Sequence, residues 1–590
     1  MVSSTLADRL DGVTTVTDVG TVIWGSGTTG RTGTIDATNS LMGTTAGDKV
    51  GSNLHALANG HYVVRSGFWR IDSATTNVGA VTWGNGTTGT TGLVSASNSL
   101  VGSHMSDVIG GTSNLISSIV VLSNGNYIVP STSWDGTTSN VGAVTWGDGA
   151  GGTTVGAISA ANSLIGGTAN DAIGNGGIVE LANGNVVVRS FQWRAGTKTA
   201  AGAVTWMSGT ALSTVGTVTS SNSLTGSTAN DQISSKGVVP LSDGSYIVLS
   251  PNWDNGTLVN AGAMTWGSGT AITAGVVSSS NSLIGTTASD SVGNFVPLAV
   301  GNGNYVFTTP NWDYISGGTT ITDAGAVTWF NLASGFPTTI TPANSLIGSH
   351  NGDKLGTAIK VLPNGNYVVI SRYWGDGTST KLGAVTWADG NTGITGTISA
   401  ANSLIGSTAD DEMGIGGTGI VVLNDGNYVI NTASWDNGTL ANAGALTWAS
   451  STKPITGTVS AANSIIGAPN NGFTVLWGGA NRNGFIAYSA GLIYSSLSDN
   501  NLAPFGLASG GDMSISTAYL NNTLSAGTSV TLQASNDITI ANAITASKTG
   551  ANIGALTLQA GRSILLNAGI TITDGDLSLT ANEILANGVV

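Results

Sequence analysis

Residues 177–224 read GIVELANGNVVVRSFQWRAGTKTAAGAVTWMSGTALSTVGTVTSSNSL and decide the fold. Four short stretches stand out between turn residues: GIVEL at 177–181, VVVRSFQW at 186–193, GAVTW at 202–206 and GTVTSSNSL at 216–224. Short apolar runs bounded by Gly, Asn and Ser are typical of β-strands. We therefore predict four consecutive antiparallel strands, named strands a to d, with a two-residue Asn-Gly turn between strands a and b.

This pattern recurs along the chain with a period of about 60 residues, which is compatible with a β-propeller blade of four strands. Each copy of GAVTW, or a close variant, ends in a tryptophan. The eight tryptophans number the repeats from 1 to 8: Trp24, Trp83, Trp146, Trp206, Trp266, Trp329, Trp387 and Trp448. The composition agrees with many short strands and tight turns, since glycine accounts for 88 of the 590 residues.

The two ends of this array complement each other. The first repeat is read as starting with strand c, and the last Asn-Gly hairpin, around Asn483, has no GAVTW after it. In a ring, the final strands a and b would pair with the first strands c and d and leave no open edge. We predict an all-β fold with an eight-bladed β-propeller over residues 1–500. The alternative is a truncated longer array, because TLADRLDG at 5–12 resembles the loop that connects repeats.

A glycine motif follows strand c. The stretch VTWGNGTTGTTG at 81–92 contains Gly-x-Gly-x-x-Gly at Gly84, Gly86 and Gly89. A dinucleotide site needs a helix after these glycines, with its N-terminus at the phosphates. A strand follows here instead, so we interpret the motif as the turn between strands c and d.

Tryptophans fall into two sets. In GAVTW the Val and the Trp share one face of the strand, which predicts that this set packs between blades. A second set ends strand b and is predicted to cap the core or, alternatively, to form a multivalent glycan-binding surface by stacking on sugar rings. Its members are Trp69, Trp134, Trp193, Trp253, Trp312, Trp374 and Trp435.

One aspartate recurs in the loop that connects repeats. The set comprises Asp48, Asp107, Asp171, Asp231, Asp290, Asp353 and Asp411, with Asp8 as a candidate eighth member. A single carboxylate per loop is a poor start for a Ca²⁺ site, so we predict side-chain bonds to the loop backbone. The four histidines share no repeat position, and no Gly-x-Ser-x-Gly motif occurs. We predict no metal, no cofactor and no catalytic residue.

Charge and composition limit the classes of partner that the chain can bind. The formal net charge is −14 with only 17 Lys plus Arg, which argues against nucleic acid as a partner. Cysteine is absent, so disulfides are excluded. No apolar run approaches the roughly 20 residues of a membrane helix, and the first residues do not read as a secretion signal. If the protein is exported, we expect this chain to be a segment of a longer one.

The period changes in residues 501–590. TLQA and SLTA steps align at Leu532, Leu558 and Leu579 and are followed by ITI, ILL and N-A-x-I segments. We predict the start of a right-handed parallel β-helix whose coils bury Leu and Ile on one another. These residues resemble the filamentous haemagglutinin type of exoprotein, which is secreted by the two-partner route. The resemblance implies a secreted or outer-membrane adhesin without catalytic residues.

From these observations we expect a non-enzymatic adhesin on the bacterial cell surface, binding surface glycans or host-cell receptors. A glycan-processing propeller enzyme is the alternative from another class. It would require two or three Asp side chains converging at one mouth of the ring. A structural spacer without a ligand is the third reading.

Overall fold

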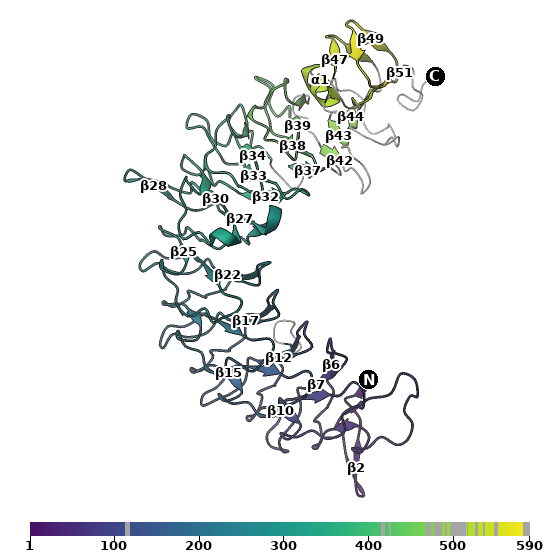
Figure 1. The fold of residues 1–590 in the computed structure, drawn as a ribbon, viewed down its shortest axis with the longest axis vertical. Helices are drawn as coiled ribbons and strands as arrows, with labels where there is room; N and C mark the ends of the chain where they lie inside the picture. Colours follow the sequence, from purple (N-terminus) through teal and green to yellow (C-terminus); the bar gives the residue numbers. More distant parts are fainter. Residues whose placement is uncertain are drawn as a thin grey trace. The chain divides into compact units, whose positions relative to one another are not determined.

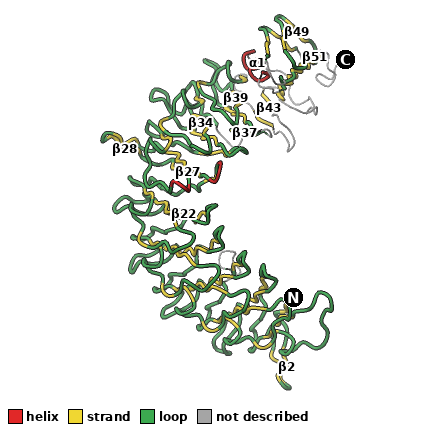
Figure 2. The backbone as a smooth tube through the Cα atoms, in the orientation of Figure 1, coloured by secondary structure: helices red, strands yellow, loops and turns green. Residues whose placement is uncertain are grey.

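The structure is a computed structural model (Figures 1 and 2). It describes residues 1–111, 118–414, 419–423, 426–467, 474–476, 486–489, 492–495, 515, 517–525, 529–534, 537–547 and 553–581. The described chain consists of short strands and turns with one α-helix, α1 (Thr517–Ser525), so the all-β prediction is confirmed. It divides into two units, Met1–Val296 and Pro297–Val590. Within the described residues, no helix has the length and apolar character needed to span a bilayer.

The first unit holds repeats 1 to 5. Repeat 1 contains β1 (Val2–Ser4), the hairpin β2 (Arg9–Asp11) and β3 (Thr14–Val16), β4 (Thr21–Ile23) and β5 (Leu41–Met42). Repeats 2 and 3 contain β6 (Asn53–Ala56), β7 (Tyr62–Ser66), β8 (Ala80–Gly84), β9 (Gly92–Leu93), β10 (Ser99–Val101), β11 (Val120–Val121), β12 (Tyr127–Ser131), β13 (Ala143–Gly147), β14 (Gly156–Ala157) and β15 (Ser163–Ile165). Repeats 4 and 5 contain β16 (Gly177–Glu180), β17 (Val186–Ser190), β18 (Ala203–Met207), β19 (Gly216–Thr217), β20 (Leu224–Thr225), β21 (Gly237–Pro240), β22 (Tyr246–Ser250), β23 (Ala263–Gly267), β24 (Gly275–Val276) and β25 (Leu283–Ile284).

The second unit holds repeats 6 to 8 and the C-terminal coils. Repeat 6 contains β26 (Leu298–Ala299), β27 (Tyr305–Thr309), the hairpin β28 (Tyr314–Ser316) and β29 (Thr319–Ile321), β30 (Ala326–Phe330), β31 (Ser345–Ile347) and the short 3₁₀ turns Gly301–Gly303 and Leu332–Ser334. Repeats 7 and 8 contain β32 (Ala358–Val361), β33 (Tyr367–Ser371), β34 (Ala384–Ala388), β35 (Gly396–Thr397), β36 (Leu404–Ile405), β37 (Ile420–Val422), β38 (Tyr428–Thr432), β39 (Ala445–Ala449), β40 (Gly457–Thr458) and β41 (Ile465–Ile466). The remaining strands are β42 (Thr474–Leu476), β43 (Ile486–Ser489), β44 (Leu492–Ser495), β45 (Val530–Ala534), β46 (Ile538–Ile540), β47 (Ile544–Ala546), β48 (Leu556–Ala560), β49 (Ile564–Leu566), β50 (Ile570–Ile572) and β51 (Leu577–Ala581).

Each complete repeat is an antiparallel sheet of four strands, as predicted. In repeat 4 the order is β16, β17, β18 and β20, with Val187 opposite Trp206. The turn between strands a and b differs from the prediction. The N–H of Gly184 donates to the Leu181 carbonyl, and Gly184, not Asn183, has positive φ, at 79°. The connection is therefore a three-residue turn that ends in a left-handed glycine.

Strand d of the prediction splits into two pieces. Gly216–Thr217 forms β19, which pairs in parallel with β15 of the preceding repeat, while Leu224–Thr225 forms β20 in its own sheet. Asn222 causes the break, because its Oδ1 accepts from the Thr219 N–H at 2.9 Å and its Nδ2 donates to the Thr217 carbonyl at 3.0 Å. Successive repeats are thus hydrogen-bonded to each other. The same parallel pair links repeats 1 through 5 in the first unit and repeats 6 through 8 in the second.

The pairing of the described strands does not show the closure of a propeller. β4, which is strand c of repeat 1, lies between β1 and β5, and β43 lies between β42 and β44. Both sides of each strand are therefore occupied by other partners. β1 is strand b of repeat 1, since Ser4 pairs with Thr21 as Ser66 pairs with Ala80 in repeat 2. The sequence reading missed β1 because its residues, Val-Ser-Ser, lack the Tyr-Val-Val pattern of the other repeats. Asn483, at the predicted final turn, lies outside the described residues.

The coils of the predicted β-helix are confirmed. Leu532 pairs with Leu558, and Leu558 with Leu579, in the parallel run β45, β48 and β51. Two further parallel pairs, β46 with β49 and β47 with β50, complete three faces. β44 pairs with β45, so this sheet begins before residue 501, the predicted domain boundary. Leu520 and Leu524 of α1 share one hydrophobic cluster with repeat 8 and the coils, and this cluster joins them into one core.

Candidate functional site

The tryptophans at the end of strand b are buried. Their exposed fractions lie between 3 and 8% in Trp69, Trp134, Trp193, Trp253, Trp312, Trp374 and Trp435. Trp134, for example, packs in one cluster with Val63, Val81 and Leu100 of the preceding repeat. No indole face of this set is open to a sugar ring, so the interpretation as a glycan-stacking surface is wrong. Strand b stops three residues earlier, and the turn that follows directs the side chain back into the core.

The tryptophans of GAVTW form the joints between repeats. Trp83 Nε1 donates to the carbonyl of Gly149, in the c–d turn of the next repeat, at 2.8 Å. The corresponding bonds are Trp24 to Gly86, Trp146 to Gly209, Trp206 to Gly269, Trp329 to Gly390 and Trp387 to Ser451. These side chains are half-buried, and Trp266, which donates to Ser245 Oγ, is 42% exposed. The set predicted to be interior therefore lies at the surface edge of each joint.

The glycine motif recurs in repeat 3 at Gly147, Gly149 and Gly152, where close packing within the repeat and at its joint with repeat 2 explains it. A Cβ on Gly147 would meet the Tyr127 ring at 2.2 Å, and one on Gly149 would stand 1.8 Å from the Gly125 carbonyl oxygen. A Cβ on Gly152 would meet the Trp83 ring of the preceding repeat at 2.4 Å. Each of these three glycines is required by close packing, and the motif lies in the turn between strands c and d, as predicted. No helix follows it, so it lacks the geometry of a dinucleotide site.

The loop aspartates act as backbone clamps, as predicted. Asp171 is fully buried; its Oδ2 accepts from the Gly167 and Thr168 N–H groups at 2.9 and 2.8 Å, and its Oδ1 accepts from Arg194 N–H at 3.0 Å. Burial raises the pKa of four of these carboxyls, and the N–H bonds oppose the shift. The four are Asp48, Asp107, Asp171 and Asp353.

Asp8 is not the eighth member of this set. Its Oδ1 accepts from the Asp18 N–H, as Asp135 Oδ1 accepts from Asn140 N–H after strand b of repeat 3. Asp8 therefore follows strand b, and TLADRLDG is not a connecting loop. Among the described residues, no group of three His, Cys, Asp or Glu side chains is placed to hold a metal ion.

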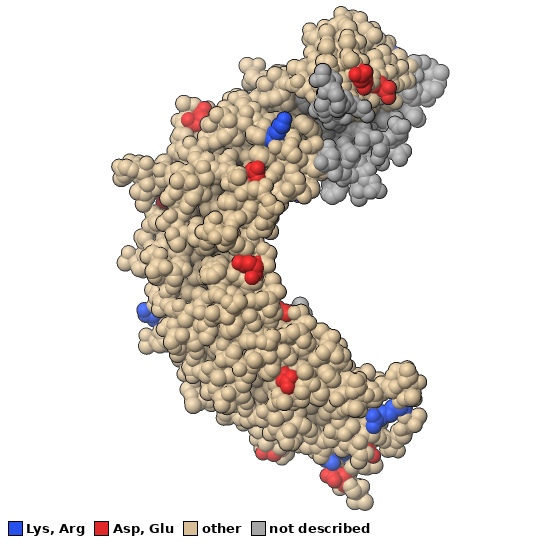
Figure 3. Space-filling model, viewed as in Figure 1, with Lys and Arg blue, Asp and Glu red and all other residues tan. Residues whose placement is uncertain are grey.

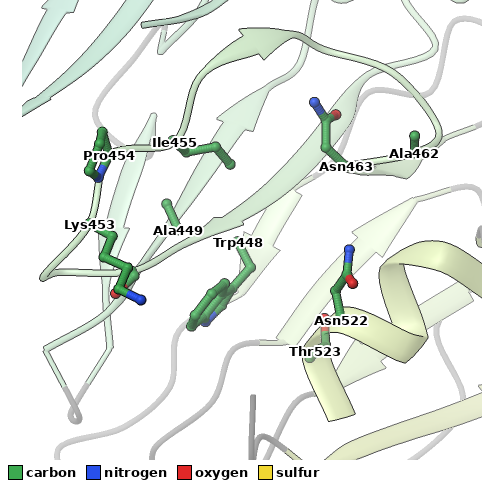
Figure 4. Close-up of a pocket in the computed structure, with 10 residues that line it drawn as sticks. Trp448, Ala449, Lys453, Pro454, Ile455, Ala462, Asn463, Asn522 and Thr523 are labelled. Carbon is green, nitrogen blue, oxygen red and sulfur yellow. The ribbon is translucent and has the colours of Figure 1, made fainter. Parts of the chain in front are cut away.

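The last tryptophan of the series lines a pocket. Residues of α1 face the c–d turn of repeat 8 beside Trp448, and a cavity of about 230 Å³ lies between the helix and this turn (Figure 4). Its polar lining includes Ser450, Lys453, Asn463, Asn522 and Thr523, and its apolar lining includes Pro454 and Ile455. Asn463 is committed to its own turn, since its Nδ2 donates to the Thr458 carbonyl at 2.9 Å. This pocket is the candidate functional site.

Sequence reasoning missed this pocket. Asn522 and Thr523 lie on a helix that the strand pattern did not predict, and α1 is distant in sequence from the turn that it faces. The one available signal was the stretch WASSTK at 448–453, in which Lys453 stands where the other repeats carry Thr, Gly, Ala or Ser.

Comparison with solved structures gives only distant likenesses. A polysaccharide lyase, Uly1, is 11% identical, with 53% of this chain and 84% of that chain covered and a TM-score of 0.22. Prolyl oligopeptidase B from Galerina marginata is 8% identical over 75% of this chain and 55% of that chain, also with a TM-score of 0.22. The extracellular domain of BT4673 from B. thetaiotaomicron is 10% identical, covering 74% and 63%, with a TM-score of 0.16. TM-scores this low support no conclusion about fold or function.

The repeats themselves match a known family. No curated protein matches the chain. The family described as "Repeat of unknown function (DUF5650)" matches at 12–52, 56–111, 121–175, 180–235, 240–294, 299–357, 361–415 and 422–474, which are the eight repeats found in the sequence. The chain therefore belongs to this family of tandem β-repeat proteins.

Proposed function

We propose that this chain is a segment of a secreted or cell-surface adhesin with no enzymatic activity. Its repeats would serve as a firm support that displays loops toward glycans or receptors on another surface. The observation that carries the proposal is that the repeated side chains serve to hold the repeats together. Most of the recurring tryptophans and loop aspartates are engaged in joints between repeats and in backbone clamps, as in the bond from Trp83 to Gly149 and those of Asp171.

The surface chemistry supports a display role. Charged side chains are sparse on the face shown in Figure 3, in line with 17 Lys plus Arg and 31 Asp plus Glu in the chain. Some loops expose apolar side chains, among them Leu10 and Val13 in the β2–β3 hairpin, at 74% and 102%, and Ile315 in the β28–β29 hairpin, at 51%. Exposed apolar groups at projecting hairpins are suited to contacts with a partner. In the second unit the repeats continue through one core into β-helix coils, which fits the haemagglutinin-type resemblance.

A binding assay tests this proposal. The purified chain, coupled to fluorescent beads, is applied to epithelial cells, bacterial cells and a glycan array, with uncoated beads as the control. We expect retention on at least one surface, and loss of retention when the β2–β3 tip is altered by Leu10→Ser and Val13→Ser. If the beads are retained on none of these surfaces, the result would favour a structural spacer without a ligand. Release of reducing ends from polysaccharides would instead favour the glycan-processing enzyme.

A further inference from the structure

The pocket beside Trp448 lies where the c–d turn of a following repeat packs at the joints between repeats 6, 7 and 8. At the inner joints the next c–d turn covers the indole closely, as the 2.4 Å approach of a Cβ on Gly152 to Trp83 shows. At repeat 8 the corresponding place is bordered by Asn522 and Thr523 of α1, and a cavity lies between these described residues and the turn. Its lining thus offers part of an aromatic side chain opposite an amide and a hydroxyl (Figure 4).

The pocket also carries a cation. Lys453 lines it, and in Figure 4 its side chain extends toward the Trp448 indole. Among the ion pairs of the described residues, none involves Lys453, whereas Lys354 and Lys381 both pair with aspartate. Among the described residues that line the pocket, none is a carboxylate. In a chain with a net charge of −14, a lysine in a pocket without an acidic neighbour favours an anionic ligand.

The other residues that line the pocket indicate the shape and the polar groups of the ligand as well as its charge. Pro454, Ile455 and the indole give apolar surface, on which the C–H face of a sugar ring can lie, while Asn522 and Thr523 can exchange hydrogen bonds with hydroxyl groups. A volume of about 230 Å³ is below the roughly 300–1,000 Å³ of sites for drug-sized ligands, so one ring fits better than a chain.

We propose that this pocket binds a single acidic sugar residue of the hexuronate type, with its carboxylate at Lys453, its ring against Trp448 and its hydroxyls at Asn522 and Thr523. The inference deepens the proposed adhesive function by naming a ligand class. It rests on that function only for its biological purpose, because binding of a free sugar does not require attachment to a cell. Failure of one is therefore distinguishable from failure of the other.

The test is titration of the whole chain with free glucuronate, followed by saturation-transfer NMR, with glucose as the neutral counterpart. We expect glucuronate to bind at millimolar concentration and glucose about tenfold more weakly, because glucose lacks the carboxylate. Lys453→Gln should lower the glucuronate affinity about tenfold and leave glucose unchanged. Asn522→Ala should weaken both sugars, and alanine at this helical position favours folding.

Lys360→Gln is the matched control, since Lys360 is an exposed lysine of strand β32 outside the pocket. It should leave both affinities unchanged. Three results would overturn the proposal. The first is equal affinity for glucose and glucuronate, and the second is a Lys453→Gln variant that binds glucuronate as tightly as the parent. The third is a loss of glucuronate affinity in Lys360→Gln as large as that in Lys453→Gln. The absence of binding would also overturn it, as would tighter binding of a Gly-Ser-Gly-Thr peptide that imitates a c–d turn.

Discussion

The joint between repeats 2 and 3 and the end of the series at repeat 8 use the same strand position differently. Trp83 donates to the Gly149 carbonyl and is covered by the next turn. Trp448 has a buried Nε1 without a hydrogen-bond partner among the described residues, and it borders an open cavity. The difference shows that the repeated sequence specifies a contact surface, and that the element following a repeat decides whether this surface is consumed in packing or remains available.

The largest expected effect lies inside an inner joint. Trp134→Ala removes a side chain that is only 5% exposed and should lower the free energy of unfolding by about 3–5 kcal/mol. Trp448→Ala should cost much less, because part of this side chain already borders a cavity. Urea denaturation of both variants measures the difference. Equal losses would mean that the two positions are equally packed.

The second comparison uses two glycines of equivalent turns. Gly149→Ala places a Cβ 1.8 Å from the Gly125 carbonyl oxygen and should cost about 1–3 kcal/mol through forced backbone movement. Gly27 occupies the same turn position in repeat 1 with nothing within 4 Å, so Gly27→Ala should change stability by less than about 0.5 kcal/mol. Thermal unfolding by calorimetry compares the pair. A destabilised Gly27→Ala variant would show that turn conformation, and not crowding, requires the glycine.

A third comparison isolates the indole N–H. Trp83→Phe keeps an aromatic ring and removes the bond to the Gly149 carbonyl, which should cost about 1 kcal/mol for the hydrogen bond, in addition to the smaller ring. Trp448→Phe removes an N–H without a partner and should cost less by that amount. Chemical denaturation of the two variants at one temperature gives the difference. Indistinguishable losses would argue against a contribution from the inter-repeat bond.

The smallest expected effect concerns pH. Burial raises the pKa of Asp171, so the folded state binds this proton more tightly than the unfolded state. The stability that results is present below the unfolded pKa of about 3.9 and is lost as pH rises through the raised value. The stability of the parent relative to Asp171→Asn should therefore be higher at pH 3 than at pH 7. Denaturation curves at both pH values test the sign, and a difference that grows with pH would contradict it.

Much of the fold was predictable because it rests on local signals. The eight repeats, the strands a to c and the alignment of Leu532 with Leu558 and Leu579 follow from periodicity and turn residues. The ring was predicted because strand b of repeat 1 was not recognised in the sequence. This strand is β1, whose residues Val-Ser-Ser differ from those of the other b strands. The tryptophans of GAVTW lie on strand c as expected, whereas the second set lies in the turn after strand b, and the burial of both sets depends on this turn and on the neighbouring repeat. The pocket depends on α1, whose position against repeat 8 is set by contacts distant in sequence.

The parallel pairs between repeats also have a mechanical meaning. Each is only two residues long, as in Leu164 with Gly216 and Ile165 with Thr217, whereas strands b and c of one repeat share five residue pairs. Once the indole bonds and the shared apolar cluster of a joint give way, a pulling force along the polypeptide should therefore separate neighbouring repeats while the sheet within each stays paired. Extension in successive small steps would let a tethered protein absorb a sudden load and recover its length afterwards.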